Sequence, residues 1–275
     1  MSDTRLAVIG CGIMGEAIVG GLLRAGLFAP GELLATTRRQ DAADAVQGRH
    51  GVAVTLDNCA ACQAASTILL TLKPQRIAKV VHEPGMREAL AGKLVISIAA
   101  GVTLVQLAEW LPESSVIRAM PNTPCLIGEG MTVLARGRGV ADAEVAIAAR
   151  LFETVGRCIE VEDKLMDAVT SLGGSGPAFV YIMIEAMADG GVMMGLPRPV
   201  ALEIAAQVFQ GAARMVLQTG RHPAALKDQV TTPAGCTIAG VLTMEDGRIR
   251  SVLARTIQEA TRVAGELGKP TAADR

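Results

Sequence analysis

The chain has 275 residues, of which 50% are hydrophobic, 19% are charged and only 2% are aromatic, and its formal net charge is −1. These values exclude an intrinsically disordered chain, and the lack of basic runs and of aromatic side chains argues against nucleic acid as a partner. The length is sufficient for one or two domains with a core of Ala, Val, Leu, Ile and Met.

The first half of the chain alternates short apolar runs with helical patterns. Strands are expected at Leu6–Ile9, Leu33–Thr36, Thr67–Leu72, Leu94–Ile98, Val116–Met120 and Met131–Ala135. Helical patterns lie between them, such as Met14–Ala25 and Gln40–His50. Strands separated by helices of this length predict an α/β fold, with a Rossmann-type doubly wound sheet covered on both faces.

A glycine pattern follows the first expected strand. In VIGCGIMG, Gly10, Gly12 and Gly15 lie directly after that strand and at the start of a helix, and Ile13 and Met14 between them are also expected at the cofactor site. Gly10 permits a tight turn, Gly12 lets the backbone approach a pyrophosphate, and Gly15 lets the helix pack closely on the strand. The N–H groups at the start of such a helix attract phosphate. The pattern therefore predicts a dinucleotide-binding site at the first βα turn.

The end of the second expected strand indicates which dinucleotide is bound. An acidic residue at this place would bind the ribose 2′-hydroxyl of NAD, but the chain has Thr36 there, followed by Arg38 and Arg39. A hydroxyl and guanidinium groups suit a 2′-phosphate, which a carboxylate would repel. We expect NADPH to be preferred, with NADH possible. The alternative is that both arginines are simply solvated at a strand end.

Two proline-containing loops follow later strands of the expected sheet. LKPQ contains Leu72, Lys73 and Pro74, and MPNTP contains Met120 and Asn122. Doubly wound sheets bind their ligands outside the carboxyl ends of the strands, which is where these loops lie. We therefore expect both loops to line the nicotinamide part of the cofactor site.

The sequence pattern changes after Cys158–Val161. From there on, β-branched runs are almost absent, and helical periodicity is broken at Gly173–Pro177, Gly195–Pro199, Gly220–Pro223 and Thr231–Gly235. We expect an NAD(P)-binding domain at residues 1–162 and an all-helical domain at residues 163–275. The final stretch, GKPTAADR, is expected to be a frayed tail.

The helical half is unusually apolar. FVYIMIEAMADGGVMMG offers few polar positions to water, so it is either a buried core helix or a subunit interface, and we favour a homo-oligomer. The most apolar stretch, Phe179–Met194, is interrupted by Glu185 and Asp189, so no membrane span is expected. The N-terminal stretch has an acid ahead of its apolar run, unlike a signal peptide, and we expect a cytoplasmic protein.

The cysteine and histidine content predicts no metal site. A cytoplasmic location makes free thiols the expected state of all six cysteines. Cys59 and Cys62 form a CxxC pair, but only His50 lies nearby, so two thiols on a short helix are the simpler interpretation. His222 precedes Pro223 and is expected at a helix start rather than as a general acid.

The late loop TTPAGCT, Thr231–Thr237, contains no His, Asp, Glu or Lys. It offers hydroxyl groups and backbone N–H groups, which suit a carboxylate ligand at a helix N-terminus. Such a loop could be a connector, or it could serve a reaction that needs little acid–base chemistry. A hydride transfer in which the cofactor carries the difficult chemistry is a reaction of this kind.

A series of motifs together resembles one family. In chain order they are GCGIMG, LKPQ, SIAAGV (Ser97–Val102), RAMPNTP (Arg118–Pro124), GGSGPAFVY (Gly173–Tyr181), ADGGVMMGLPR (Ala188–Arg198) and LKDQVTTPAGCTIAGV (Leu226–Val241). Over essentially its whole length, the sequence resembles the pyrroline-5-carboxylate reductase family. The last motif is the most specific of them, whereas the glycine pattern is shared with many dehydrogenases.

The resemblance implies a fold, a reaction and an assembly. The fold would be an N-terminal Rossmann domain followed by a helical dimerisation domain, with homodimers assembled into larger rings such as a decamer. The reaction would be NAD(P)H-dependent reduction of 1-pyrroline-5-carboxylate, an imino acid, to L-proline, the last step of proline biosynthesis. The active site would lie between the Rossmann domain of one subunit and helical-domain loops that include those of the partner.

The resemblance also implies roles for individual residues. Thr237 would be the catalytic residue, beside the ring nitrogen of the substrate, and backbone N–H groups of Gly235–Thr237 would hold the carboxylate. Asn58, Lys73 and Asn122 match family positions near the cofactor. The substrate-binding positions that the resemblance implies are Ser175, Gly176, Val230, Thr231, Gly235, Cys236 and Thr237.

The chain departs from the family pattern in the late loop. The family usually has two adjacent glycines there, whereas this chain has Ala234, Gly235 and Cys236, so Ala234 needs a backbone conformation that glycine adopts freely.

Two other functions are weighed against reduction of 1-pyrroline-5-carboxylate. One alternative is an NADP oxidoreductase of the beta-hydroxyacid dehydrogenase type, but the lysine that such enzymes use is absent from SLGGSGPAFVYIMIEAM. The other alternative is a non-catalytic NADP-binding sensor, which would not need the late loop.

Overall fold

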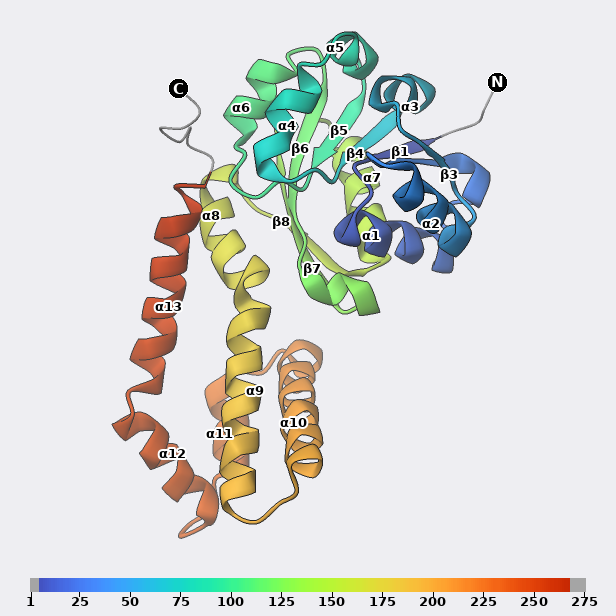
Figure 1. Cartoon of the computed structure of the whole chain (residues 1–275). Coiled ribbons are helices and arrows are strands. Elements are labelled where there is room, and N and C mark those ends of the chain that lie inside the picture. Colours follow the sequence, from blue (N-terminus) through green and yellow to red (C-terminus); the bar gives the residue numbers. More distant parts are fainter. Residues whose placement is uncertain (1–4, 268–275) are drawn as a thin grey trace. The chain divides into compact units, whose positions relative to one another are not determined.

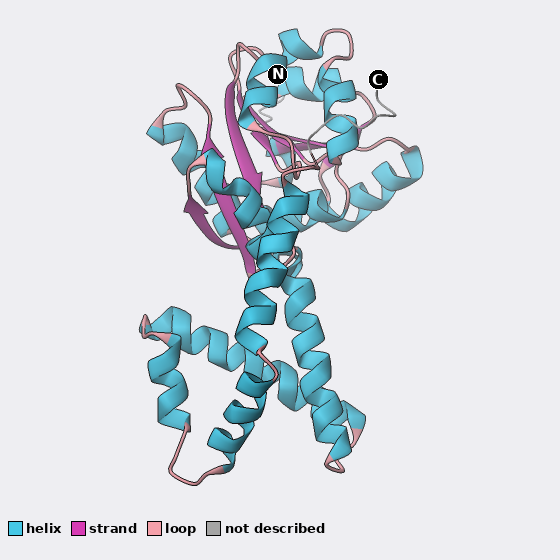
Figure 2. Ribbon diagram, turned by 90° about the vertical axis from the view of Figure 1, so that its left-hand side faces the viewer, coloured by secondary structure: helices cyan, strands magenta, loops and turns pink. Residues whose placement is uncertain are grey.

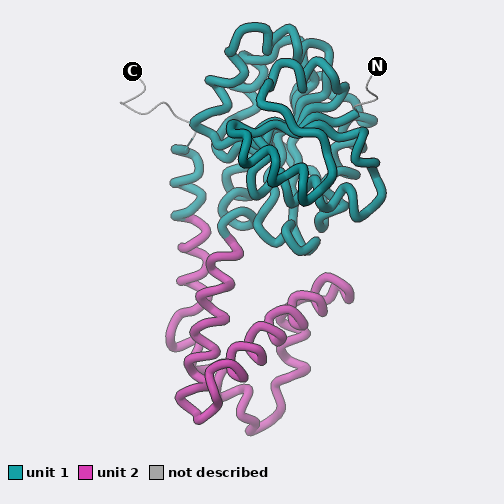
Figure 3. The backbone as a smooth tube through the Cα atoms, turned by 45° about the vertical axis from the view of Figure 1, so that its right-hand side comes forward, with its two compact units in different colours: residues 1–175, 259–275 teal, residues 176–258 magenta. Residues whose placement is uncertain are grey.

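The computed structural model describes residues 5–267, so the tail expected at 268–275 lies outside the described residues. The chain divides into two compact units, Met1–Ser175 with Glu259–Arg275, and Gly176–Gln258 (Figure 3). The predicted division into residues 1–162 and 163–275 differs from this, because residues 163–175 pack with the sheet. Met166, for example, is buried in a cluster with Val133 and Ala135 of a sheet strand.

Unit 1 is built on one eight-stranded sheet with the order β3-β2-β1-β4-β5-β6-β7-β8. All neighbouring strands are parallel except the antiparallel pair β6 and β7. The strands are β1 (Leu6–Ile9), β2 (Leu33–Thr36), β3 (Ala53–Thr55), β4 (Thr67–Leu70), β5 (Leu94–Ser97), β6 (Ser115–Met120), β7 (Gly130–Arg136) and β8 (Gly156–Glu160). The order reverses between β1 and β4, which is the position where doubly wound sheets bind their ligands.

Helices cover both faces of this sheet, as the sequence predicts (Figure 1). They are α1 (Ile13–Arg24), α2 (Gln40–His50), α3 (Asn58–Ala64), α4 (Pro74–Val81), α5 (Met86–Leu90), α6 (Leu104–Trp110), α7 (Asp142–Glu153) and α8 (Met166–Val169). Alternate residues of β1 enter different cores: Leu6 and Val8 pack with α1, α2 and α7, whereas Ala7 and Ile9 pack with α3–α6. Both faces are buried, because successive side chains of a strand point to opposite sides.

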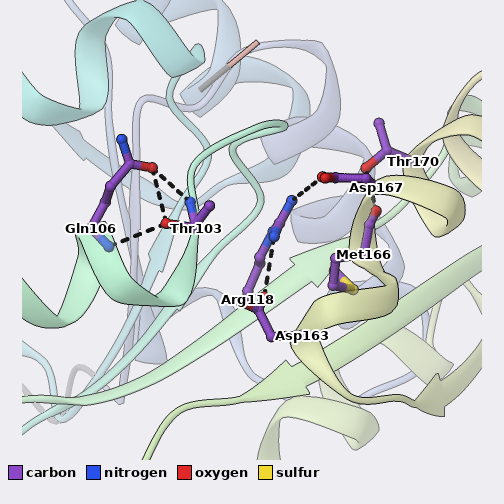
Figure 4. Close-up of polar contacts among 7 residues, drawn as sticks. All are labelled: Thr103, Gln106, Arg118, Asp163, Met166, Asp167 and Thr170. Atoms are coloured by element: carbon purple, nitrogen blue, oxygen red, sulfur yellow. Dashed lines mark hydrogen bonds and ion pairs between the residues drawn. The ribbon is translucent and has the colours of Figure 1, made fainter. Parts of the chain in front are cut away.

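Polar contacts tie the segment that follows the sheet to strand β6. The Arg118 side chain is buried, and its guanidinium lies 3.1 Å from a carboxylate oxygen of Asp163 and 3.7 Å from one of Asp167 (Figure 4). These acids lie on the short helices η3 (Asp163–Leu165) and α8, and a π-helical turn, η4 (Thr170–Gly174), follows. A buried arginine needs such partners, so this pairing explains why residues 163–175 belong to the first unit.

Unit 2 contains helices and loops, and all strands described, magenta in Figure 2, belong to unit 1. Its helices are α9 (Gly176–Met193), α10 (Arg198–Thr219), α11 (Pro223–Val230), α12 (Cys236–Asp246) and α13 (Ile249–Ala264), the last of which ends among residues grouped with unit 1. Helices α9 and α10 pack through small residues, with Ala188, Ala201 and Ala205 buried between them. His222 begins α11 as its N-cap, which confirms its predicted place.

The apolar helix predicted as either a core element or an interface is not buried within one chain. On α9 and just after it, Tyr181, Ile182, Met193 and Met194 are exposed, with fractions of 60%, 65%, 86% and 84%. Large apolar surfaces of this kind mark places where proteins associate. The buried-core alternative therefore does not hold for the single chain.

Helix α10 is the element that bears on the expectation that the chain has no membrane span. Among the described residues it is long and apolar enough to cross a membrane by length and composition, with a mean hydropathy of 1.3. Helix α10 is therefore a second apolar stretch besides Phe179–Met194, the one that the sequence singles out. One such helix is weak evidence for a membrane span, since helices that pack against other protein have the same composition.

Most predicted elements are confirmed, several with ends shifted by one residue, and three strands differ further. Strands Leu6–Ile9 and Leu33–Thr36 and helix Gln40–His50 have the predicted bounds. Strand β4 ends at Leu70 rather than Leu72, because the chain turns there toward the glycine loop. Strands β3 and β8 were not predicted. The three residues of β3 are too few to show an alternating pattern.

Candidate functional site

The glycine turn between β1 and α1 has the geometry that its sequence predicts. Gly10 has a φ of +83°, and a Cβ atom at this position would lie 2.4 Å from Cδ2 of Leu72. Gly12 is the N-cap of α1 and makes no side-chain cap, so the first-turn N–H groups of the helix have no intrahelical partner. A Cβ atom at Gly15 would lie 2.9 Å from the Thr71 hydroxyl, so only glycine lets α1 pack this closely.

The Thr36 side chain contacts the glycine turn from the protein interior and does not face the cofactor site. Its side chain has no exposed surface, and its hydroxyl accepts a hydrogen bond from the Gly10 N–H at 2.9 Å. The same hydroxyl donates to Oδ1 of Asn58 at 2.7 Å. We therefore correct the expectation that the Thr36 hydroxyl receives a 2′-phosphate. Thr36 and Asn58 hold the glycine turn in place.

A cavity of about 550 Å³ lies above the glycine turn, at the carboxyl ends of β1, β2 and β4. The predicted cofactor residues that line it are Gly10, Gly12, Ile13, Met14, Arg38, Arg39, Leu72 and Lys73. The lining residues that the sequence did not suggest are Cys11, Thr37, Ala42, Thr71 and Arg76. One cavity thus collects side chains and backbone from three loops that are far apart in the sequence.

The charges around this cavity are positive. Arg38, Lys73 and Arg76 form no ion pair with any described residue, whereas Arg39 pairs with Asp41 at 3.1 Å. The lining contains no carboxylate. This environment suits a ligand with more than one phosphate, because guanidinium groups bind phosphate oxygens in pairs of hydrogen bonds.

Two ionisable groups near the turn have shifted pKa values. Burial raises the pKa of the Cys11 thiol to about 12, so Cys11 lines the cavity as a neutral thiol. The hydrogen bond from Arg49 lowers the pKa of Glu16, which lies in the first turn of α1, and His50 also contacts this carboxylate. Glu16 is therefore ionised and compensated by groups of α2 rather than by a ligand.

Several predicted cofactor residues lie outside the cavity lining. Pro74 is the first residue of α4, where its fixed backbone angle suits the helix start. Asn58 lines a separate open hollow of about 780 Å³. Asn122 uses both ends of its amide: Oδ1 accepts from the Met131 N–H at 2.9 Å, and Nδ2 donates to the Gly173 carbonyl at 3.0 Å.

Asn122 and Met120 therefore hold the segment before Gly176 against the sheet. A Cβ atom at Gly174 would lie 2.5 Å from Cε of Met120. The Gly173 carbonyl that Asn122 binds belongs to the π-helical turn, a type of turn that is frequent at functional sites. These contacts position Ser175, whose N–H donates to the Thr170 carbonyl at 3.0 Å and whose hydroxyl has no partner among the described residues.

The late loop in unit 2 forms a tight turn that begins α12. Val230 ends α11 and is exposed, and the Thr231 hydroxyl donates to the Lys227 carbonyl at 2.9 Å. Ala234 has a φ of +54°, which confirms the expectation that a glycine would be freer at this position. Gly235 is the N-cap of α12, and its N–H donates to the Thr232 carbonyl at 3.1 Å.

This turn leaves a small set of donors at the start of α12. The Gly235 N–H is already bonded, whereas the N–H groups of the first three residues of α12, Cys236, Thr237 and Ile238, have no backbone partner. The Thr237 side chain is half-buried, and its hydroxyl forms no hydrogen bond with any described residue. An anion at this end of an 11-residue helix would find these donors and the positive end of the helix dipole.

The described residues also bear on the predictions about metal sites and free cysteines. Within residues 5–267, no group of three or more His, Cys, Asp or Glu side chains could hold a metal ion. All six cysteines are free, as predicted. Cys59 and Cys62 lie on the short helix α3, and burial raises the pKa of Cys62 to about 12. Its thiol is therefore unreactive, which favours the structural interpretation of the CxxC pair.

Two family models match the chain. Residues 163–267 match the pyrroline-5-carboxylate reductase dimerisation family, and residues 5–101 match the family of NADP oxidoreductases that depend on coenzyme F420. The first match covers the helices of unit 2, and the second covers β1 to β5, including most of the loops that line the cavity.

Curated relatives match nearly the whole chain. The pyrroline-5-carboxylate reductase of Schizosaccharomyces pombe is 43% identical over 278 residues, covering 95% of this chain and 98% of its own. That of Synechocystis is 42% identical, covering 96% of this chain and 98% of its own. Among solved structures, the pyrroline-5-carboxylate reductase of Coxiella burnetii has a TM-score of 0.91 and 32% identity, covering 98% of this chain and 100% of its own. The Plasmodium falciparum enzyme with NADP bound has a TM-score of 0.86 and 26% identity, covering 98% and 100%.

Proposed function

Because the chain belongs to the pyrroline-5-carboxylate reductase family, we propose that it reduces 1-pyrroline-5-carboxylate to L-proline with NAD(P)H. The cofactor supplies a hydride to the C=N carbon, and the ring nitrogen becomes a secondary amine. One observation carries the proposal: the chain has both a cavity at the glycine turn, lined by cations and by no carboxylate, and a late loop without an acid–base residue.

The cavity fits a phosphorylated dinucleotide. The free N–H groups at the start of α1 suit its pyrophosphate, and a Cβ atom at Gly10 would collide with Leu72, so the close turn depends on glycine. Arg38, which has no ion-pair partner among the described residues, is the first candidate for a 2′-phosphate, so we propose a preference for NADPH over NADH. Leu72 and Lys73 form the adjoining loop, and Pro74 begins the helix that follows it.

The late loop suits the substrate. In this proposal the N–H groups of Cys236 and Thr237 hold the carboxylate, with the helix dipole of α12 adding to the attraction. The Thr237 hydroxyl hydrogen-bonds the ring nitrogen as it changes from a protonated imine to an amine. Gly235 shapes the turn rather than donating to the ligand, since its N–H is already bonded. Val230, Thr231, Ser175 and Gly176 are proposed as the surrounding substrate-binding positions.

The site must also hold the two reactants in line. Positioning of this kind can contribute roughly 7–11 kcal/mol to lowering the barrier, so a reaction between a hydride donor and a protonated imine does not require a separate general acid. Asn122 and Met120 serve this purpose in the proposal as positioning residues for Ser175, through their contacts with Gly173 and Gly174.

We further propose that the working protein is a homo-oligomer in the cytoplasm. The apolar side chains exposed on unit 2 supply a surface for a second copy, and the matched dimerisation family spans the same helices. A homodimer, or a larger ring such as a decamer, would bury this surface.

Replacing Thr237 tests the proposal at its most specific residue. With 1-pyrroline-5-carboxylate and NADPH, Thr237→Ala should lower kcat by about tenfold or more, because it removes a hydrogen bond to a group that changes charge during the reaction. Thr237→Ser is the matched control, since it keeps the hydroxyl and should retain most of the activity. Unchanged turnover of Thr237→Ala would remove this role, and no turnover of the wild-type protein would remove the proposed function.

A further inference from the structure

Arg76 lines the cofactor cavity but belongs to a different element from the arginines after β2. It lies in the first turn of α4, where its N–H donates to the carbonyl of the N-cap residue Lys73 at 2.9 Å. The side chain is half-buried. It forms no ion pair and no side-chain hydrogen bond with any described residue, so its guanidinium is available to a ligand.

The position of Arg76 is electrostatically unfavourable for the protein alone. The N-terminal end of a helix carries a partial positive charge, which favours anions and disfavours cations. Helix α4 has no acidic residue in its first turn, and Lys73 adds a second positive charge at the same end. No described residue compensates the positive charge of Arg76, whereas an anion bound in the cavity would compensate it.

The loop after β2 lies on the other side of β1 from the loop after β4, and it supplies a matching group. Arg38 follows β2 and is unpaired among the described residues, while Arg39 is already partnered by Asp41. The glycine turn and the start of α1 account for a pyrophosphate, so these two arginines remain for a second phosphate. A phosphate monoester carries roughly −1.5 to −2 charges near pH 7 and offers enough oxygens for two guanidinium groups.

From these contacts we infer that Arg76 and Arg38 hold the 2′-phosphate of the dinucleotide from opposite sides, with Arg76 as a specificity-determining residue. The inference rests on the proposed NADP(H)-dependent function. The loop after β4 then takes part in choosing the cofactor, in addition to the loop after β2.

Binding of nucleotide fragments tests this directly. We would measure the Kd of adenosine 2′,5′-bisphosphate and of 5′-AMP by calorimetry, for the wild type, Arg76→Ala, Arg76→Lys and Lys79→Ala. Arg76→Ala should weaken binding of the bisphosphate by about tenfold or more and leave 5′-AMP within about twofold. Arg76→Lys should lie between, because lysine keeps the charge but lacks the planar fork. Lys79→Ala removes the same charge from α4 at a residue that does not line the cavity, and should change neither Kd.

The same measurements can overturn the inference. An equal loss for both fragments would assign Arg76 to the adenosine or the 5′-phosphate, and no loss would remove Arg76 from binding. A wild type that binds both fragments equally would remove the 2′-phosphate site itself. The melting temperature without ligand should not fall in Arg76→Ala, since an uncompensated cation is removed; if that variant unfolds, Arg76→Gln replaces it. Tight bisphosphate binding without turnover of 1-pyrroline-5-carboxylate would leave this inference intact and remove only the proposed function.

Discussion

At the scale of single residues, the sequence indicates which positions build the cofactor site but not which of them face a ligand. Arg38 and Arg39 were predicted to lie at the end of a strand, and both line the cavity. Thr36 was placed in the same group, yet its hydroxyl is buried between Gly10 and Asn58. Sequence spacing places a residue at a strand end, whereas the direction of its side chain depends on the twist and register of the neighbouring strands.

The role of Thr36 can be tested by removing its hydroxyl. Thr36→Val keeps the side-chain shape but leaves the Gly10 N–H and the Asn58 amide oxygen without their partner. We expect the free energy of unfolding to fall by about 1–3 kcal/mol, and the affinities for NADPH and NADH to fall by similar factors. Thr36→Ser is the control, since it keeps the hydroxyl. A loss confined to NADPH would show that Thr36 reads the 2′-phosphate after all.

The position of Arg76 at the cavity could not be predicted from the sequence. The stretch LKPQRIAK gives no sign of which of its cations enters the site. The answer depends on where α4 begins, because a helix turns by 3.6 residues and a shift of one residue points a different side chain at the cavity. In the structure Pro74 begins the helix, and that register directs Arg76 to the cavity and leaves Lys79 outside it.

At the scale of elements, strong local patterns were sufficient for most of unit 1. Apolar runs bounded by turns identify the central strands, and the glycine pattern fixes the junction of β1 and α1. The division between α12 and α13 was missed, because it occurs at Gly247 and Arg248 without a proline, and Arg248 adopts a φ of +55°. A non-glycine residue in this conformation is set by the surrounding fold rather than by its own preference.

The apolar side chains exposed on the helices of unit 2 predict that copies of the chain associate. Ile182 on α9 is 65% exposed, so Ile182→Asp should shift the protein toward the monomer in light scattering coupled to size exclusion, because it places a charge in an apolar contact. Ile147→Asp is the matched control: Ile147 is 44% exposed on α7 of unit 1. A wild-type protein that is monomeric at micromolar concentration would contradict the proposed homo-oligomer.

At the scale of the whole molecule, the family relationship and the chemistry of the two loops point to the same reaction. The chain covers almost the full length of its relatives. The glycine turn has a conformation that suits Gly10, and in the late loop Ala234 adopts a φ of +54°, which glycine would adopt more freely. The boundary between the compact units could not be read from the sequence, because it depends on Arg118. A buried arginine on β6 binds acids about 45 residues later in the chain, and no local pattern reports such a contact.

The most direct test of the central claim follows the hydride itself. Purified protein would be mixed with 1-pyrroline-5-carboxylate and NADPH carrying deuterium at the reactive position of the nicotinamide, prepared separately for each face of the ring. Hydride transfer to the C=N carbon predicts L-proline with a single deuterium at C5 from one of the two cofactors, and unlabelled L-proline from the other. Proline without deuterium from both, or no proline while the cofactor remains bound, would contradict hydride transfer to the C=N carbon.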